Sequence, residues 1–165
     1  MRLDQFAAGG GGEIAEARVE AKSHFEIVTH SPAETLEFGR TLALEFGSPC
    51  LVLLEGDLGS GKTTLTKGII SGLGLAREDE VTSPSFTLVH EYGREKKAYH
   101  VDLYRIEGQR EMATLGLDEL FSQSAVVIIE WGEKLGDDRS GPYIRIKMEY
   151  LASEDRKITV ERLES

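Results

Sequence analysis

Several residue types and patterns that mark other classes of protein are scarce or missing in this sequence. A single cysteine, Cys50, excludes an intramolecular disulfide and fits the reducing conditions of the cytoplasm. No apolar run approaches the roughly 20 residues that a membrane-spanning helix needs, so we expect no membrane partner. The first residues lack the basic start and apolar core of a signal peptide, and we therefore expect a cytoplasmic protein.

Basic residues are also fewer than acidic residues. Lysine and arginine number 19 against 29 aspartate and glutamate residues, which gives a formal net charge of −10. Proteins that bind nucleic acid directly usually present a basic face, because neutralising phosphate charge supplies most of their non-specific affinity. The basic residues here are scattered among the acids, so we expect neither a DNA partner nor tight direct binding of RNA.

The remaining composition is that of a soluble globular protein. The 165 residues are 40% hydrophobic and 29% charged, which allows one ordinary domain with an apolar core. Residues 1–23 are the exception, because they contain the glycine run Gly9 to Gly12 and the polar, alanine-rich segment Glu13 to Lys22. Glycine tracts cannot bury a core. We therefore predict a flexible tail over residues 1–23 and a single domain over residues 24–165.

The most specific pattern is a glycine-rich loop that lies between an apolar strand, Cys50 to Leu54, and a helical segment that ends near Leu73. Glycines in such a loop permit positive φ and let the backbone approach an anion, which the helix N-terminus also favours. Lys62 is expected to reach the β- and γ-phosphates and the Thr63 hydroxyl to coordinate Mg²⁺. The spacing Gly-x-x-x-x-Gly-Lys-Thr predicts that the chain binds a nucleoside triphosphate. The loop consists of Gly56, Asp57, Leu58, Gly59, Ser60, Gly61, Lys62, Thr63 and Thr64.

Periodicity and turn residues predict an α/β, P-loop NTPase-like fold in three layers, with a mixed sheet that includes antiparallel strands. A hydroxyl cap and a proline at Ser31-Pro32 begin the first expected helix. The expected helices cover residues 32–46, 62–73, 109–114 and, after an interruption at Gly116, up to Phe121. The expected strands cover residues 25–28, 50–54, 86–92, 97–104, 125–129, 143–151 and 156–163.

Two acids could complete a phosphate-handling site. Glu130 follows five apolar residues, as a Mg²⁺-binding acid does at the end of a buried strand, although an exposed acid could end a strand in the same way. Strand alternation places His100, Asp102 and Tyr104 on one face. A polar strand face is usually solvated, so the spacing of Asp102 by itself favours simple exposure.

Three other features have both a functional and a structural interpretation. The hydroxyl-rich segment Thr82 to Thr87 could respond to the γ-phosphate as a switch loop, but its composition favours a turn before a hairpin. Trp131 could stack near a nucleotide or pack in the core. The histidines show no metal-ligand spacing, and we expect them on the surface or in strands. They are His24, His30, His90 and His100.

Four motifs follow one another along the chain: Gly56-Asp-Leu-Gly-Ser-Gly-Lys-Thr-Thr64, Thr82-Ser-Pro-Ser-Phe-Thr-Leu-Val89, His100-Val-Asp-Leu-Tyr-Arg105 and Glu130-Trp-Gly-Glu-Lys134. In this combination the chain resembles the bacterial TsaE (YjeE) family, the ATPase component of the system that makes threonylcarbamoyladenosine in tRNA. The resemblance extends roughly from Phe25 to Leu163. Ser85 stands where the family more often has threonine, which keeps the hydroxyl.

The resemblance implies an ATPase that uses ATP and Mg²⁺, with Lys62, Asp102 and Glu130 as catalytic residues. Asp102 would face the triphosphate and help to position the attacking water or the metal. Glu130 would coordinate Mg²⁺ together with Thr63. The other implied contacts are Ser31 and Thr35 beside the adenine, Thr82 to Ser85 as a switch-like loop near the γ-phosphate, and Trp131 and Lys134 near the nucleotide.

The resemblance also implies partners, the TsaD and TsaB subunits of the complex that transfers the threonylcarbamoyl group. The expected role is hydrolysis of ATP in support of N6-threonylcarbamoyladenosine formation at the anticodon-adjacent adenosine, without transfer of the group by this chain. Hydrolysis would be slow alone and stimulated by the partners. Contact with tRNA would be indirect, which agrees with the acidic charge.

A phosphate loop of this kind also occurs in three other classes of nucleotide-binding protein. A small-molecule kinase of the P-loop class normally needs clustered arginines in a lid, and only Arg94, Arg105 and Arg110 could converge here. A GTPase of the common kind is excluded, because its Asn-Lys-x-Asp guanine reader needs asparagine and this chain has none. A module that binds ATP only to hold subunits together stays open, because the same residues bind and hydrolyse.

Overall fold

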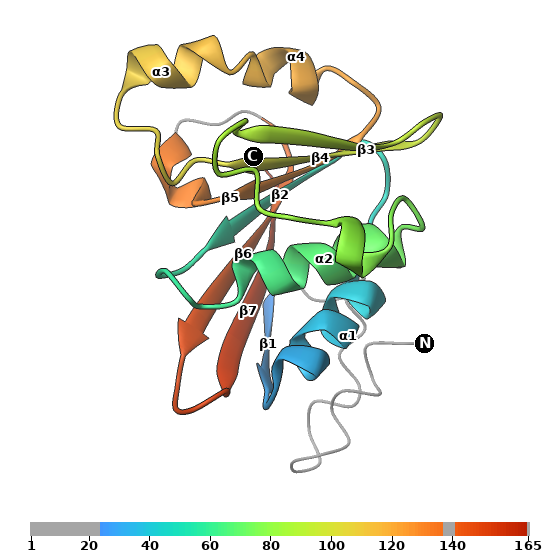
Figure 1. Cartoon of the computed structure of the whole chain (residues 1–165), viewed down its shortest axis with the longest axis vertical. Helices are drawn as coiled ribbons and strands as arrows, with labels where there is room; N and C mark the ends of the chain where they lie inside the picture. The colour runs from blue at the N-terminus through green and yellow to red at the C-terminus, as the bar shows by residue number, and fades with distance from the viewer. Residues whose placement is uncertain (1–23, 137–140, 165) are drawn as a thin grey trace.

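The computed structural model describes residues 24–136 and 141–164 (Figure 1). The tail expected over residues 1–23 lies outside these described residues. No helix in the described ranges is long and apolar enough to cross a membrane. The strands are β1 (His24–Thr29), β2 (Cys50–Glu55), β3 (Val89–Gly93), β4 (Lys97–Asp102), β5 (Val126–Glu130), β6 (Tyr143–Tyr150) and β7 (Arg156–Leu163). The α-helices are α1 (Pro32–Ala43), α2 (Lys62–Gly72), α3 (Gln109–Thr114) and α4 (Leu117–Phe121), with short 3₁₀ helices at Glu78–Glu80 and Gly132–Leu135.

The strands form one mixed sheet in the order β1-β7-β6-β2-β5-β4-β3. At its centre β5 pairs in parallel with β2 and β4, and β2 pairs in parallel with β6. The outer strands run antiparallel to their neighbours, β3 to β4, β7 to β6 and β1 to β7. The predicted α/β fold with a mixed sheet is therefore confirmed, together with the hairpin around Gly93.

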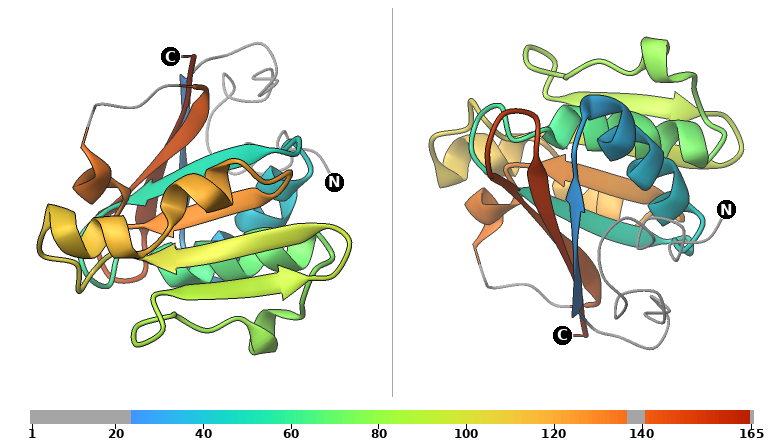
Figure 2. Two further views of the ribbon diagram at one scale, coloured as in Figure 1. Left: turned by 90° about the horizontal axis from the view of Figure 1, so that it is seen from above. Right: turned by 90° about the horizontal axis from the view of Figure 1, so that it is seen from below.

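Helices cover both faces of the sheet, which gives the expected three layers (Figures 1 and 2). On one face α1 and α2 bury Phe38 and Ile69 in a core cluster with Ile128 of β5. On the other face the shorter α3 and α4 pack over a second cluster, in which Leu117 joins Leu53 of β2. Because both faces of β5 are covered, every residue of this strand is buried, as its continuous apolar pattern predicts.

α1 begins as the sequence predicts but ends earlier. Pro32 is its first residue, and the Ser31 Oγ accepts a hydrogen bond from the Glu34 N–H at 3.1 Å. The helix was expected to continue to Phe46, whereas it ends at Ala43. The next residues close into tighter turns, in which the Phe46 N–H donates to the Ala43 carbonyl at 3.2 Å.

The β3–β4 hairpin is shorter than predicted at both open ends. β3 begins at Val89 rather than Phe86, because Leu88 has a left-handed φ of 66°, which interrupts the extended backbone. The Leu88 N–H instead donates to the Pro84 carbonyl at 2.7 Å and closes a turn. β4 ends at Asp102, so its last residue lies at the carboxyl end of the parallel part of the sheet.

α1 and α2 approach each other closely where both carry glycine. A Cβ atom added at Gly68 would lie 2.1 Å from the backbone oxygen of Leu36, and one at Gly39 would lie 2.6 Å from that of Leu65. The backbones therefore meet at a distance that only glycine permits. Because α2 begins at Lys62, this contact fixes the helix that leads out of the predicted phosphate loop.

Candidate active site

The segment between β2 and α2 forms the loop in which the sequence predicts phosphate binding. Gly56, Gly59 and Gly61 have φ values of 151°, 80° and 102°, a region that residues with a side chain rarely adopt. A Cβ atom on Gly56 would also lie 2.5 Å from the backbone oxygen of Met148. The loop leads into the N-terminus of α2 at Lys62, where the first backbone N–H groups have no acceptor within the helix. These donors and the helix dipole suit an anion.

Lys62 is folded into this loop, with 5% of its surface exposed. Its ammonium group donates to the carbonyls of Gly56 at 2.6 Å and Asp57 at 2.9 Å, and to the Ser60 Oγ at 3.3 Å. Burial lowers the pKa of Lys62, and surrounding carboxylates, Glu130 first among them, act in the opposite direction. The charge is thus held by neutral oxygen atoms of the loop, beside the Trp131 ring whose centroid lies 4.2 Å from Nζ.

Glu130 and Thr63 meet where β5 ends and α2 begins. The Thr63 hydroxyl donates to the Glu130 carboxylate, at 3.0 Å from Oε1 and 3.3 Å from Oε2. Glu130 is 2% exposed, so the interpretation of it as an exposed strand-ending acid is wrong. The register pairs Glu130 with Asp102 of β4 and Leu54 of β2, which places both acids at the carboxyl ends of adjacent parallel strands.

The Thr63 hydroxyl and the Glu130 carboxylate fit Mg²⁺ as part of a ligand set. Mg²⁺ prefers oxygen ligands and is usually bound by one or two carboxylates together with substrate phosphates and water. In the described residues, no three His, Cys, Asp or Glu side chains gather into a metal site. A hydroxyl and a carboxylate beside an anion-binding loop are the arrangement in which the remaining ligands would come from a bound phosphate.

Asp102 is buried rather than solvated, in contrast to what its polar strand face suggested. It is 6% exposed and His100 is 0% exposed, because this face of β4 turns towards α2 and the core that contains Ala98. Both carboxylate oxygens have donors: the Ser83 hydroxyl reaches Oδ2 at 2.9 Å and the Tyr104 N–H reaches Oδ1 at 2.9 Å. The carboxylate is therefore held in a fixed position within the site.

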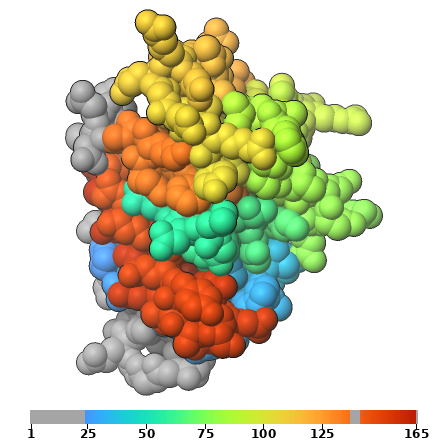
Figure 3. All heavy atoms as spheres, turned by 60° about the vertical axis from the view of Figure 1, so that its left-hand side comes forward, coloured from blue at the N-terminus to red at the C-terminus, as the bar shows by residue number. Residues whose placement is uncertain are grey.

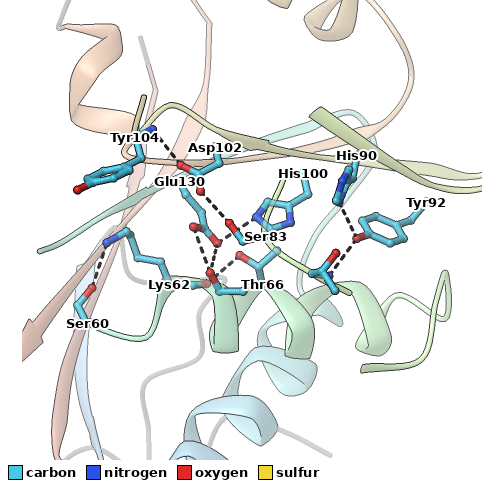
Figure 4. A network of polar contacts seen from close by, with 12 residues as sticks. Ser60, Lys62, Thr66, Ser83, His90, Tyr92, His100, Asp102, Tyr104 and Glu130 are labelled. Carbon is cyan, nitrogen blue, oxygen red and sulfur yellow. Dashed lines mark hydrogen bonds and ion pairs between the residues drawn. The ribbon is translucent and has the colours of Figure 1, made fainter. Parts of the chain in front are cut away.

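The hydroxyl-rich segment before β3 contacts the site through Ser83, which was not singled out within the predicted range. The Thr82 side chain is exposed, but its backbone N–H donates to the Tyr92 hydroxyl at 3.4 Å. The Tyr92 hydroxyl also lies 3.4 Å from His90 Nδ1. Ser85 is half-buried. The segment is thus tied to the hairpin at one point and to Asp102 at another, as Figure 4 shows.

The residues expected beside the adenine form the corner between β1 and α1. Ser31 caps the helix, and the hydroxyls of Thr35 and Thr29 share a hydrogen bond of 2.7 Å. Their polar atoms are thus engaged in building this corner, and a contact to adenine stays a prediction. The Lys134 ammonium group donates to the carbonyls of Tyr104 at 2.7 Å and Ile106 at 3.1 Å, and its expected place near the nucleotide also stays a prediction.

Two residues that the sequence analysis did not assign to the site lie in it. His100 Nε2 is 3.0 Å from Glu130 Oε1, and the only signal for this was its shared strand face with Asp102. Arg156 of β7 donates from Nη2 to the Gly59 carbonyl at 3.3 Å across 97 residues of sequence, which no local pattern could reveal. Figure 3 shows the loop, in teal, at the surface beside the red β6–β7 hairpin.

The arginines considered for a kinase lid do not all converge at one point. Arg94 lies in the turn before β4 and Arg110 lies in α3, which follows β4, so the strand separates them (Figure 1). Arg105 stacks on the exposed Phe86, with its guanidinium carbon 4.6 Å from the ring centroid. These three arginines therefore do not form the single cluster that would favour a kinase.

Known proteins match this chain over most of its length. Residues 29–158 match the profile of the family described as "Threonylcarbamoyl adenosine biosynthesis protein TsaE". The tRNA threonylcarbamoyladenosine biosynthesis protein TsaE of Treponema pallidum is 36% identical over 135 residues, 81% of this chain and 97% of that protein. The Bacillus subtilis protein of the same name is 40% identical over 133 residues, 79% of this chain and 81% of that protein. The crystal structure of Bacillus subtilis YdiB has a TM-score of 0.70 and 31% identity over 86% of both chains. The chain therefore belongs to the TsaE family.

Proposed function

We propose that this protein is an Mg²⁺-dependent ATPase that supports the formation of threonylcarbamoyladenosine in tRNA. The observation that carries the proposal is the contact between the Thr63 hydroxyl and the buried Glu130 carboxylate, directly beside the glycine loop. This pairing joins the two groups that hold Mg²⁺ in P-loop enzymes. The family and the names of the relatives from Treponema pallidum and Bacillus subtilis support the tRNA-modifying role.

Each group in the site has a distinct task in this proposal. The loop N–H groups and Lys62 bind and orient the phosphates of ATP, with Lys62 exchanging some of its contacts to loop carbonyls for phosphate oxygens. Thr63 and Glu130 hold Mg²⁺, which when bound neutralises phosphate charge. Asp102, fixed by Ser83 and the Tyr104 N–H, orients the attacking water. Catalysis then rests on positioning and on electrostatic stabilisation.

The proposed partner is the complex of TsaD and TsaB, and this chain would not transfer the threonylcarbamoyl group itself. A net charge of −10 disfavours direct contact with tRNA and leaves the nucleic acid to the partner. The loop that holds Asp102 through Ser83 also carries Phe86, which is 84% exposed and stacked by Arg105. An exposed aromatic side chain beside arginine is typical of protein interfaces. A partner that binds Phe86 would thereby act on the loop that fixes Asp102.

The proposal is tested by steady-state ATP hydrolysis, measured for the purified protein alone and after addition of purified TsaB–TsaD complex. We expect slow release of phosphate alone and marked stimulation by the complex, with Lys62→Ala inactive in both assays. Phe86→Ser is expected to lose stimulation while keeping nucleotide affinity.

The other outcomes separate the alternative functions. Nucleotide binding without phosphate release in any mixture would indicate an assembly module. A phosphorylated small molecule among the products would indicate a kinase. Absence of both stimulation and binding to the complex would remove the proposed partner.

A further inference from the structure

A buried histidine lies behind the proposed metal ligand. His100 of β4 is 0% exposed, and its Nε2 lies 3.0 Å from Glu130 Oε1 (Figure 4). Because a carboxylate only accepts hydrogen bonds, Nε2 carries the proton in this contact. In the described part of the chain, the other ring nitrogen, Nδ1, is buried and has no hydrogen-bond partner.

Packing alone does not explain why a histidine occupies this buried position. Its register partner on β5 is Ile128, and Ala98, two residues earlier on the same strand face, belongs to the apolar core under α1 and α2. A buried polar nitrogen without a partner is destabilising, so an aliphatic side chain would fill this position at lower free energy. The compensating interaction that the structure provides is the hydrogen bond to Glu130.

We propose that His100 is a positioning residue that sets the orientation of the Glu130 carboxylate and thereby the strength with which Mg²⁺ and nucleotide bind together. The inference rests on the proposed function. Nε2–H holds Oε1 from the side of β4, while the Thr63 hydroxyl contacts both carboxylate oxygens from α2. Glu130 is thus fixed between two donors on different elements, so that it faces the start of α2. Groups that orient metal ligands typically change metal affinity about 10–100-fold when they are removed.

The test uses the factor by which Mg²⁺ tightens nucleotide binding, which is a coupling between two ligands and needs no turnover. The dissociation constant of ADP is measured with excess Mg²⁺ and with EDTA, through the fluorescence of Trp131. This residue is the chain's single tryptophan, and its ring centroid lies 4.2 Å from Lys62 Nζ. We expect His100→Leu to reduce the coupling factor roughly 10–100-fold and to leave the affinity in EDTA unchanged. His100→Gln, which keeps an N–H donor, is expected to restore much of the factor.

Two further variants make the test specific. Thr66→Val removes another buried polar group, whose hydroxyl donates to the Lys62 carbonyl at 2.8 Å within α2, and it should leave the coupling factor intact. If His100 acts through Glu130, then adding His100→Leu to Glu130→Gln should lower the coupling factor no further. If His100→Leu alone folds poorly, His100→Ala, which also removes the N–H donor, takes its place in the same cycle.

The outcomes are distinguishable. An unchanged coupling factor in His100→Leu, or equal losses with Mg²⁺ and with EDTA, would show a packing residue and overturn the inference. Independent, additive losses in the double variant would overturn it as well. If the unaltered protein itself shows no Mg²⁺-dependent binding of nucleotide, the proposed function fails before any variant is compared.

Discussion

Substituting Gly68 by alanine would place a methyl group in the contact between α1 and α2. The added Cβ would lie 2.1 Å from the backbone oxygen of Leu36 and 3.0 Å from Gly39 Cα. An ordinary contact begins at 3.4 Å, so the shortfall to the oxygen is 1.3 Å (3.4 − 2.1). The obstructing atom belongs to the α1 backbone and cannot rotate away as a side chain can. The two helices must therefore separate.

The size of the effect follows from two opposing contributions. Overpacking of a close-packed interior costs about 1–3 kcal/mol, and a clash with helix backbone belongs at the upper end of that range. Alanine regains about 1 kcal/mol over glycine in helix propensity. We expect the free energy of unfolding to fall by about 2 kcal/mol, since the clash outweighs the propensity.

Urea unfolding followed by far-UV circular dichroism measures this change. With an m-value of about 2 kcal/mol/M, the midpoint should fall by about 1 M. Gly47→Ala is the matched control, because in the described structure its added Cβ meets no heavy atom within 4 Å, and its midpoint should barely move. A Gly68→Ala protein as stable as the Gly47→Ala protein would refute the reasoning. Separation of the helices should also weaken nucleotide binding, because α2 starts at the loop.

Three further predictions concern single side chains of the site and of β2. Lys62→Ala should weaken nucleotide binding roughly 10–100-fold, because it removes a hydrogen bond from a charged group. The dissociation constant is measured by Trp131 fluorescence, and an unchanged value would contradict the loop assignment. Asp102→Asn should reduce the rate of ATP hydrolysis on the order of 100-fold with little change in nucleotide affinity, whereas equal losses of both would indicate a structural or metal-binding role. Burial raises the pKa of Cys50 to about 11, against the opposing charge of Arg162. At about pH 8 its reaction with iodoacetamide should therefore be on the order of 100-fold slower in the folded protein than in urea, and should accelerate as the pH rises towards the folded pKa. Equal rates would contradict the burial of this thiol.

Features determined by neighbouring residues could be predicted from the sequence. The start of α1 at Ser31 follows from a hydroxyl cap and a proline, and the break between α3 and α4 follows from Gly116, which has a φ of 65°. The glycine loop before α2 could be predicted for the same reason, because positive φ and a helix N-terminus are local properties. The end of α1 was predicted too far along the chain, because a turn stabilised by backbone bonds has no distinctive residue pattern.

The polar residues of β4 and β7 that belong to the site are fixed by contacts that form only in the folded chain. Alternation placed His100 and Asp102 on one face of a strand, but exposure depends on what covers that face, and α2 covers it. The contact of His100 with Glu130 needs two parallel strands in one register, and that of Arg156 with Gly59 joins residues 97 apart. Local residue pattern was enough to identify the phosphate loop and to mark the two acids as candidates. The packing of the sheet against α2 buries both acids and gives each carboxylate hydrogen-bond partners from other segments, because distances between remote segments are set by the whole core and not by local residue pattern.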